Sequence, residues 1–370
     1  MSAKKNHTEF TEWSDQLNPF NSMKVLVWRE QLEALAKGKI LPPVTVDTDP
    51  TNKCNFNCPH CNAQKYRSEE EHTLSEKQLN NLVCIYSDFG VKSTCVSGGG
   101  EPTLNPHLAT FIWDLNYHSI ESGVITNGSV ITEKQIDAIL HCSRWCGISV
   151  DASNGDTFIK IKGIKNKDIF GKVIKNIENM CKINSKLKGR MCDIAFKYLL
   201  FPENVSEIYD AVKLAKEIGC QHFHLRPACV DNIESNNKCE TLDFTKHISL
   251  FDEQISKAME LEDGNFKVFG IRHKFGKNFK RKLNFSKCRA TPLLATFGAD
   301  GNCHLCFDMR GKKEFVMCKH EEILKFWGSD KHKKMINSIN INECPRCTFG
   351  TYNEIIEKVF IKDSMCKNFP

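Results

Sequence analysis

The chain has 370 residues, of which 41% are hydrophobic and 26% are charged, and its formal net charge is +6. This composition excludes wholesale disorder, because it can build a core for two domains or for one large domain with an appendage. No apolar run approaches the roughly 18 residues of a membrane span and the polar start lacks a signal-peptide core, so we expect a cytoplasmic protein with no membrane partner.

The first two thirds of the chain alternate predicted strands and helices. A polar lead-in and a helix over 23–37, closed by Gly38, come first. Pro42-Pro43 then separates this helix from an alternating strand pattern. Further along, capping signals such as Ser75 with Gln78 mark helix starts. The predicted strands, each followed by a helix, are 44–48, 93–97, 123–126, 147–151, 193–201 and 222–226.

Six strand–helix units predict an α/β fold with a parallel sheet and helices outside. Six are too few for an eight-stranded barrel, so we expect a partial (β/α)6 barrel or an open sheet, with functional groups at the carboxyl ends of the strands. After a helix near 243–261, a hairpin over 291–309 turns at Asp300-Gly301, and short helices follow. The predicted units are an N-terminal extension (1–40), a core domain (41–264) and a small hairpin-plus-helices domain (265–370).

Three closely spaced cysteines, Cys54, Cys58 and Cys61, follow the first predicted strand. The chain has 19 cysteines, and such a set without an export signal favours metal binding or catalysis over disulfides. Three thiolates on one short loop can ligate three irons of a cubane iron–sulfur cluster and leave the fourth iron without a protein ligand. A zinc knuckle with its fourth ligand elsewhere is the alternative.

A glycine-rich turn, Gly99-Gly100-Glu101, follows the second predicted strand. Glycines let a backbone approach a ligand closely, and Glu101 supplies an acceptor for an ammonium group. Such a turn alone is as often a tight turn as a cofactor site. One strand–helix unit after the cysteine triad, it indicates a cofactor site.

The triad together with Gly99-Gly100-Glu101-Pro102 resembles the radical S-adenosylmethionine (radical SAM) superfamily over about residues 44–230. The resemblance implies a 4Fe-4S cluster on the triad whose open iron binds SAM. It also implies that one electron cleaves SAM to methionine and a 5′-deoxyadenosyl radical, which abstracts a substrate hydrogen. An electron donor such as flavodoxin or ferredoxin is implied as a partner.

The same resemblance assigns further residues to SAM. Gly99, Gly100 and Glu101 would hold the methionyl ammonium, and His60 would lie near the adenine together with the apolar stretch 199–201. Polar residues at the ends of the third and fourth strands would contact the ribose: Thr126, Asn127, Ser149 and Asp151. Residues of these types are equally common as turn formers and helix caps.

A second cysteine group lies in the C-terminal part, where a C-x2-C pair follows the hairpin. Four of these thiols could close a second cluster: Cys288, Cys306, Cys344 and Cys347. The arrangement resembles the auxiliary-cluster extension of radical SAM proteins in its shorter "twitch" form, because the longer SPASM form has a cysteine where this chain has Asn353. The resemblance therefore implies one auxiliary 4Fe-4S cluster. A four-thiolate zinc site is the alternative, and Cys303 and Cys318 are competing ligands.

Charge points to the substrate. The segment 272–282 carries six Lys and Arg and no acid, which equals the whole net charge of +6. It suggests an anionic partner such as a phosphate, a nucleotide-linked sugar or an acidic peptide, unless it is a solvated linker. Nucleic acid is the less expected partner. Arg226, at the end of the sixth strand, and Lys197, in the fifth, are candidates for substrate binding or proton removal.

The sequence therefore predicts a radical SAM oxidoreductase with one auxiliary cluster. We expect a two-electron oxidation of a small carbohydrate or cyclitol, by resemblance to twitch-bearing aminocyclitol dehydrogenases, with the basic segment favouring a charged substrate. The alternative is a radical SAM enzyme that crosslinks or epimerises a peptide. A more distant alternative is a non-catalytic zinc or redox-sensing protein.

Overall fold

The protein is organised around one ten-stranded sheet with the order β12-β11-β10-β1-β2-β3-β4-β5-β6-β9. The computed structural model describes residues 22–61, 63–189, 192–230, 240–241, 244–270, 284–344 and 347–362. Neighbouring strands from β1 to β9 run parallel. These strands are β1 (Thr45–Thr48), β2 (Ser93–Val96), β3 (Glu121–Thr126), β4 (Ser143–Ser149), β5 (Asp193–Leu200), β6 (His222–Pro227) and β9 (Lys267–Gly270).

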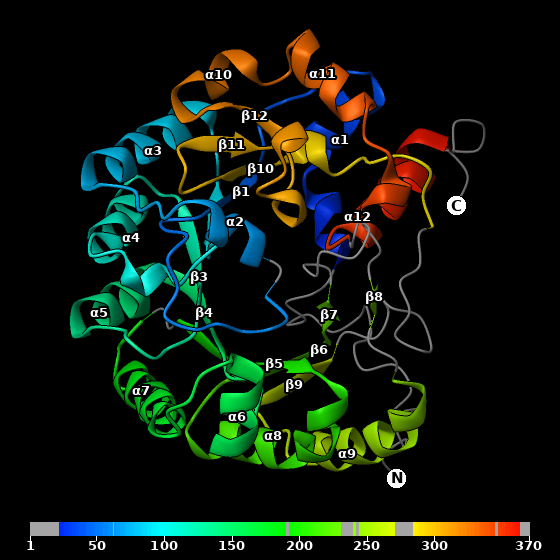
Figure 1. Ribbon diagram of the computed structural model, residues 1–370. Helices are drawn as coiled ribbons and strands as arrows, with labels where there is room; N and C mark the ends of the chain where they lie inside the picture. Colours follow the sequence, from blue (N-terminus) through cyan, green and yellow to red (C-terminus); the bar gives the residue numbers. More distant parts are fainter. Residues whose placement is uncertain are drawn as a thin grey trace.

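Helices cover one side of this sheet and follow one another along the left and lower side of Figure 1. They are α3 (Glu76–Phe89), α4 (Leu108–Tyr117), α5 (Glu133–Cys142), α6 (Gly155–Lys162), α7 (Asp168–Asn184), α8 (Ile208–Glu217) and α9 (Ile248–Met259). The predicted capping box of Ser75 and Gln78 opens α3, and Gly90 closes it with a φ of 77°. The apolar faces of these helices and of the strands form one continuous core. The predicted α/β fold with six parallel strand–helix units is confirmed.

The sheet extends beyond the predicted core domain at one edge. β9 follows the boundary expected at residue 264 and pairs in parallel with β6, with Phe223 opposite Val268. Its four residues are too few for a periodic apolar pattern, so this strand was not predicted. The core sheet therefore continues to Gly270.

The predicted C-terminal hairpin is present and joins the same sheet at the other edge. It consists of β10 (Leu294–Phe297) and β11 (Asn302–His304), and Gly301 in the turn has a φ of 76°. A third strand, β12 (Val316–Lys319), was not predicted. Because β10 pairs in parallel with β1, with Thr45 opposite Leu294, the C-terminal part is attached directly to the first core strand.

Short helices complete the C-terminal part: α10 (Ile323–Phe326), α11 (Asp330–Asn337) and α12 (Gly350–Ile355). The single helix predicted over 23–37 is wrong. The structure has two elements there, a 3-10 helix (Ser22–Val27) and α1 (Arg29–Ala36), which meet at Trp28. The Trp28 ring lies 6.1 Å from Tyr352 of α12 in an edge-to-face contact. The N-terminal extension therefore packs on the C-terminal helix.

A separate small sheet consists of β7 (Cys229–Val230) and β8 (Glu240–Thr241).

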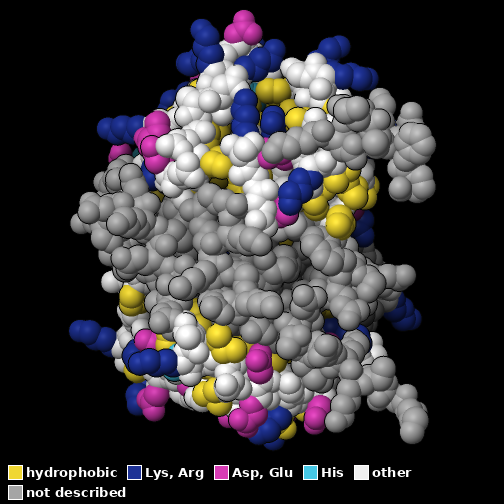
Figure 2. All heavy atoms as spheres, turned by 90° about the vertical axis from the view of Figure 1, so that its right-hand side faces the viewer, with side chains coloured by type: hydrophobic (Ala, Val, Ile, Leu, Met, Phe, Trp, Pro, Cys, Tyr) yellow, Lys and Arg dark blue, Asp and Glu magenta, His cyan; other side chains and the backbone are white. Residues whose placement is uncertain are grey.

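Figure 2 shows the face of the molecule that lies on the right in Figure 1. On the described part of this face, both Lys and Arg side chains and Asp and Glu side chains are exposed. The basic segment 272–282 lies outside the described residues, so the anionic partner expected from it stays a prediction. Within the described ranges, no helix is long and apolar enough to cross a bilayer.

Candidate cofactor and substrate site

The cysteine triad lies on the loop that follows the carboxyl end of β1. Cys54 and Cys58 pack against the core, and burial raises the pKa of both thiols, that of Cys58 to about 11. Helix α2 (Gln64–Glu69) begins just after the triad. On the opposite side the end of α6 touches the loop so closely that a Cβ on Gly163 would lie 2.0 Å from the Asn57 carbonyl oxygen. Neighbouring helices thus fix the loop from two sides.

Two cations that the sequence did not single out flank the triad. Arg67 of α2 places Nη1 3.9 Å from the Cys61 sulfur and donates from Nη2 to the Phe56 carbonyl at 2.9 Å. Lys162, at the end of α6, pairs with Asp151 at 2.5 Å, and their side chains are 3% and 1% exposed. Although burial by itself would lower it, Asp151 and Cys58 hold the pKa of Lys162 above its usual value. Positive charge near thiols favours the thiolate form that ligates metal.

This arrangement fits an iron–sulfur cluster. Among the described residues, no three His, Cys, Asp or Glu side chains converge as ligands of a single metal ion. A cubane cluster does not require that convergence, because each thiolate ligates a different iron. Three thiols on one fixed loop, with a buried lysine and an arginine beside them, match the donor set and the charge of such a cluster.

The glycine-rich turn after β2 packs directly on the cysteine loop. A Cβ on Gly100 would lie 2.0 Å from the Lys53 carbonyl oxygen, and one on Gly99 would lie 2.3 Å from the Tyr66 ring. Glu101 also donates its backbone N–H to Lys53 at 2.7 Å. In the structure the close approach that requires glycine is therefore to the cysteine loop, and the expected contact with SAM stays a prediction.

Glu101 brings two of the predicted ribose residues together at the strand ends. Its side chain is 3% exposed, and its carboxylate accepts hydrogen bonds from the Thr126 hydroxyl (2.5 Å) and the Asn127 backbone N–H (2.7 Å). Burial raises the pKa of Glu101, and hydrogen bonds from Thr103 and Thr126 oppose the rise. These contacts join the ends of β2 and β3 around one buried carboxylate.

The other predicted SAM residues lie at the ends of β4 and β5. Asp151 has a φ of 65°, and besides the ion pair with Lys162 it accepts the Leu199 N–H at 2.6 Å. Half-buried Ser149 lies opposite Lys197 in the β4–β5 register. The predicted adenine contacts come together, because the His60 ring lies 4.4 Å from that of Phe201. Burial lowers the pKa of His60 to about 4, so the ring is neutral at pH 7.

The two predicted catalytic residues interact with each other. Burial and the nearby Arg226 guanidinium lower the pKa of Lys197 to about 8, and its Nζ lies 5.6 Å from the Trp145 ring centroid. A third group was missed by the sequence analysis. This group is Asp47 of β1. Its neighbour Thr48 forms a hydrogen bond with the Tyr86 hydroxyl of α3. Because successive side chains of a strand point to opposite faces, Asp47 faces away from that helix.

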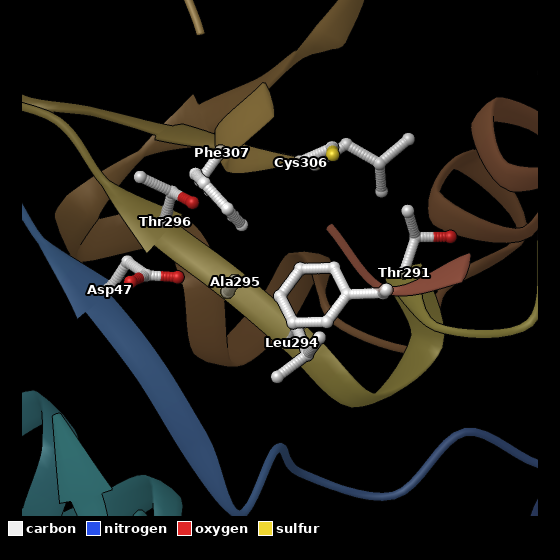
Figure 3. Close-up of a pocket in the computed structure, with 9 residues that line it drawn as sticks. Asp47, Thr291, Leu294, Ala295, Thr296, Cys306 and Phe307 are labelled. Carbon is white, nitrogen blue, oxygen red and sulfur yellow. The ribbon is translucent and has the colours of Figure 1, made fainter. Parts of the chain in front are cut away.

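Asp47 is a titratable group with an unusual environment. Burial raises the pKa of its carboxyl to about 7, against the opposing effect of Arg310. Figure 3 shows Asp47 at one end of a small cavity, about 10 Å³, with Thr296 beside it and Cys306 across the cavity. Cys95, opposite Asp47 on β2, interacts electrostatically with both Asp47 and Lys197. The first core strand thus presents an acid toward the C-terminal cysteines.

The four predicted auxiliary ligands come together in the C-terminal part. Cys306 interacts with Cys288 and Cys347, and Cys347 interacts with Cys288 and Cys344. The competing pair lies elsewhere, because Cys303 and Cys318 face each other across β11 and β12. The role of Cys288, Cys306, Cys344 and Cys347 as cluster ligands stays a prediction.

Asn353, which stands where a longer cysteine pattern would continue, is fully buried beside these thiols. It donates to the Cys347 sulfur at 3.6 Å and accepts the Ala290 N–H at 2.9 Å. It also accepts the Arg289 N–H, next to Cys288. Its amide therefore joins two cysteine-bearing segments.

We expect Asp47→Asn to stabilise the protein more at pH 8 than at pH 5. The unfolded carboxyl has a pKa of about 3.9, and the folded one titrates near 7. The folded state therefore holds the proton more tightly, and stability falls as pH rises from about 4 to about 7. Asn mimics the protonated form at every pH. Urea unfolding at both pH values, with exposed Asp88→Asn as the control, measures the difference; equal gains at both would contradict the assignment.

Comparisons with known proteins give the following matches. Residues 48–215 match the model of the Radical SAM superfamily. The chain is 26% identical over 237 residues to the GTPase Obg of Brachyspira hyodysenteriae, covering 60% of this chain and 32% of that protein. It is 34% identical over 145 residues to the GTP 3′,8-cyclase of Aliarcobacter butzleri, covering 37% and 43%. The chain thus spans less than half the length of either relative.

Solved structures resemble the fold of most of the chain. Streptococcus suis SuiB bound to S-adenosylmethionine has a TM-score of 0.64 at 16% identity and covers 94% of this chain and 83% of that one. SuiB bound to the precursor peptide SuiA has a TM-score of 0.62 at 18% identity, with coverage of 95% and 82%. At these identities the likeness concerns the fold.

Proposed function

We propose that this chain is a radical SAM enzyme that oxidises a small carbohydrate or cyclitol by two electrons with the help of one auxiliary cluster. The match of residues 48–215 to the model of the Radical SAM superfamily supports this proposal. The cofactors of the domain are a 4Fe-4S cluster and SAM, which together supply a radical able to remove a substrate hydrogen. The thiols that would hold this cluster are Cys54, Cys58 and Cys61. Those that would hold the auxiliary cluster, an electron acceptor, are Cys288, Cys306, Cys344 and Cys347.

The chain's own residues position the cofactor and the substrate. The turn Gly99–Glu101 lies against the cysteine loop, where it would hold the methionyl ammonium of SAM. His60, neutral and packed on Phe201, forms with it an aromatic surface for adenine. Arg226 stays charged at any physiological pH and would bind an anionic group of the substrate. The substrate would then bind near Arg226 and Lys197, which interact with each other.

Two buried titratable groups, Lys197 and Asp47, which both interact with Cys95, support the proposal of an oxidation. Turning an alcohol into a ketone removes a proton as well as electrons, so the site needs a proton acceptor close to an electron acceptor. Lys197 has a pKa of about 8 and Asp47 a pKa of about 7. Asp47 also shares a cavity with Cys306, one of the proposed auxiliary ligands. Groups poised near working pH are typical of catalytic acids and bases.

A substrate panel tests this proposal. Reconstituted protein is incubated without oxygen with SAM, dithionite and each of several C-deuterated polyols, aminocyclitols and sugar phosphates. We expect deuterium in 5′-deoxyadenosine and a ketone product that lacks two hydrogens. SAM cleavage without an oxidised product from any member of the panel would contradict the carbohydrate or cyclitol substrate.

A peptide substrate is the second candidate. The likeness to SuiB bound to its precursor peptide, over 95% of this chain, favours it. Peptides encoded beside the gene are therefore added to the panel, and a crosslinked or epimerised peptide would replace the first proposal. GTP is included as a third probe because of the Aliarcobacter relative, and a GTP-derived product would contradict both candidates.

We expect Lys197→Met to lower the rate of product formation at least about 100-fold, as is common when a general acid or base is removed. Cleavage of SAM without substrate should persist, because Lys197 does not belong to the cysteine loop or the glycine turn. Both rates are measured by chromatography of 5′-deoxyadenosine and product. The matched control is Lys213→Met on the exposed side of α8. A variant with full product formation would remove Lys197 from the catalytic set.

A further inference from the structure

Arg310 belongs to the C-terminal part of the chain, yet its guanidinium reaches the glycine-rich turn of the core. It follows Cys306 by four residues, and its side chain is 7% exposed. Nη1 donates to the Gly98 carbonyl oxygen at 3.2 Å. Nε lies 3.2 Å from a carboxylate oxygen of Asp49, which follows β1 and is fully buried. The guanidinium thus bridges the ends of β1 and β2 from outside the core domain.

The residue after Arg310 touches the other half of the same site. Gly311 has a φ of 81°, and a Cβ there would lie 3.1 Å from Cβ of Tyr66. The Tyr66 hydroxyl accepts the Asp300 N–H at 3.3 Å, and its ring occupies the space beside Gly99. One tyrosine of α2 is therefore enclosed by the glycine turn on one side and by the C-terminal hairpin on the other.

The hydrogen bond to Gly98 sets the orientation of the guanidinium. The Nε and Nη2 atoms of Arg310 are buried and have no hydrogen-bond partner among the described residues. The contact with Asp49 is an ion pair to a carboxylate that also interacts electrostatically with Asp47. Gly98 itself has a φ of 153°. A Cβ added to it would lie 3.3 Å from backbone atoms of Thr51 and Gly100. The Gly98 carbonyl is thus part of a tightly packed turn, and Arg310 donates a hydrogen bond to it.

We propose that Arg310 is a positioning residue for SAM: by holding the Gly98 carbonyl it fixes the Gly99–Glu101 turn, so that SAM affinity depends on the C-terminal part of the chain. This inference rests on the proposed function in that the turn holds the methionyl ammonium of SAM. By linkage, bound SAM stabilises the contact between the two parts by the same factor that the contact adds to SAM affinity.

The test compares SAM binding by reconstituted full-length Arg310→Met with that by the unmodified chain. We expect the Kd for SAM to rise about tenfold, which corresponds to ~1.4 kcal/mol. Equilibrium dialysis gives the Kd, and the change in the electron paramagnetic resonance spectrum of the reduced cluster on SAM addition gives an independent readout. Iron content should not change. An unaltered Kd would overturn the proposal.

A second variant separates positioning from stability, because Arg310→Met leaves Asp49 buried without its cation. In Asp49→Asn/Arg310→Met that buried charge is gone, so we expect the melting temperature to recover while the Kd for SAM stays raised. Recovery of the Kd together with the melting temperature would show a purely structural role and overturn the proposal. Arg310→Lys keeps the charge but not the planar guanidinium, so we expect an intermediate Kd.

A matched control and a prior measurement complete the design. Arg144→Met removes an exposed arginine that pairs with Glu121 at the opposite end of the strands, and it should leave the Kd unchanged. Cleavage of saturating SAM by the unmodified chain under dithionite is measured first. Its absence would refute the proposed function, whereas its presence with an unaltered Kd in Arg310→Met would refute only the role of Arg310.

Discussion

Replacing Cys54, Cys58 and Cys61 together by Ala is expected to abolish the formation of 5′-deoxyadenosine from SAM. The three thiols follow β1 on one loop fixed by neighbouring helices, and without them no iron is presented to SAM. Iron should fall from about eight to about four atoms per chain, because the four C-terminal thiols would still hold one cluster. Iron analysis and chromatography after anaerobic reduction with dithionite measure both quantities.

The complementary variant serves as its control. Cys344→Ala/Cys347→Ala should also lose about four irons, yet it should still cleave SAM in the absence of substrate, because these thiols lie in the C-terminal group. Cys84→Ala, at an exposed thiol of α3, should change neither quantity. Persistence of 5′-deoxyadenosine in the triple variant, or zinc in place of iron in the unmodified chain, would contradict the assignment.

Lys162→Met should lower the free energy of unfolding by about 3–5 kcal/mol, the range for a buried ion pair that loses one partner. Its partner Asp151 is 1% exposed and would keep an uncompensated charge at the end of β4. The same variant should take up less cluster, because Lys162 interacts with Cys58 at the edge of the triad. Urea unfolding gives the stability, and iron per chain gives the cluster content.

Two matched variants identify the cause. Lys160→Met removes an exposed lysine from the same helix and should cost little. Asp151→Asn/Lys162→Met removes both charges, so most of the lost stability should return. The iron content should remain low in this double variant, since the cation beside Cys58 is still missing. If the double variant loses as much stability as Lys162→Met, the cause is lost packing and not the unpaired charge.

Much of the fold follows from local patterns. The capping box at Ser75, the left-handed Gly90 and the alternation in β1 each depend on residues close in the chain, and these elements are found where the sequence predicts them. Several short elements were missed, among them the sheet strands β9 and β12, which have four residues each. A strand of that length forms because a neighbouring strand edge is open to it, and the sequence does not record that neighbour.

The site divides in the same way. Cys54, Cys58, Cys61 and the glycine turn stand out because their spacing is itself the signal. Lys162 and Arg310 carry no such signal, because a lysine at a helix end or an arginine between short elements is ordinarily exposed. Arg310 pairs with Asp49 from a distant part of the chain, whereas Lys162 is only 11 residues from Asp151 and is buried because α6 packs back on the end of β4. The signals that could have marked them are Asp151, which follows β4, and Asp49, which follows β1.

The composition excluded wholesale disorder, and the cysteine spacing together with the glycine-rich turn predicted, by resemblance, an iron–sulfur cluster and SAM. Only the tertiary structure decided which charges meet that cofactor. It brings Lys162 beside Cys58, Arg310 onto Gly98 and Asp47 onto the cavity that reaches Cys306. The physical reason is that ligand spacing is a property of a few consecutive residues, whereas burial and electrostatic pairing arise only when strands and helices far apart in the chain pack together.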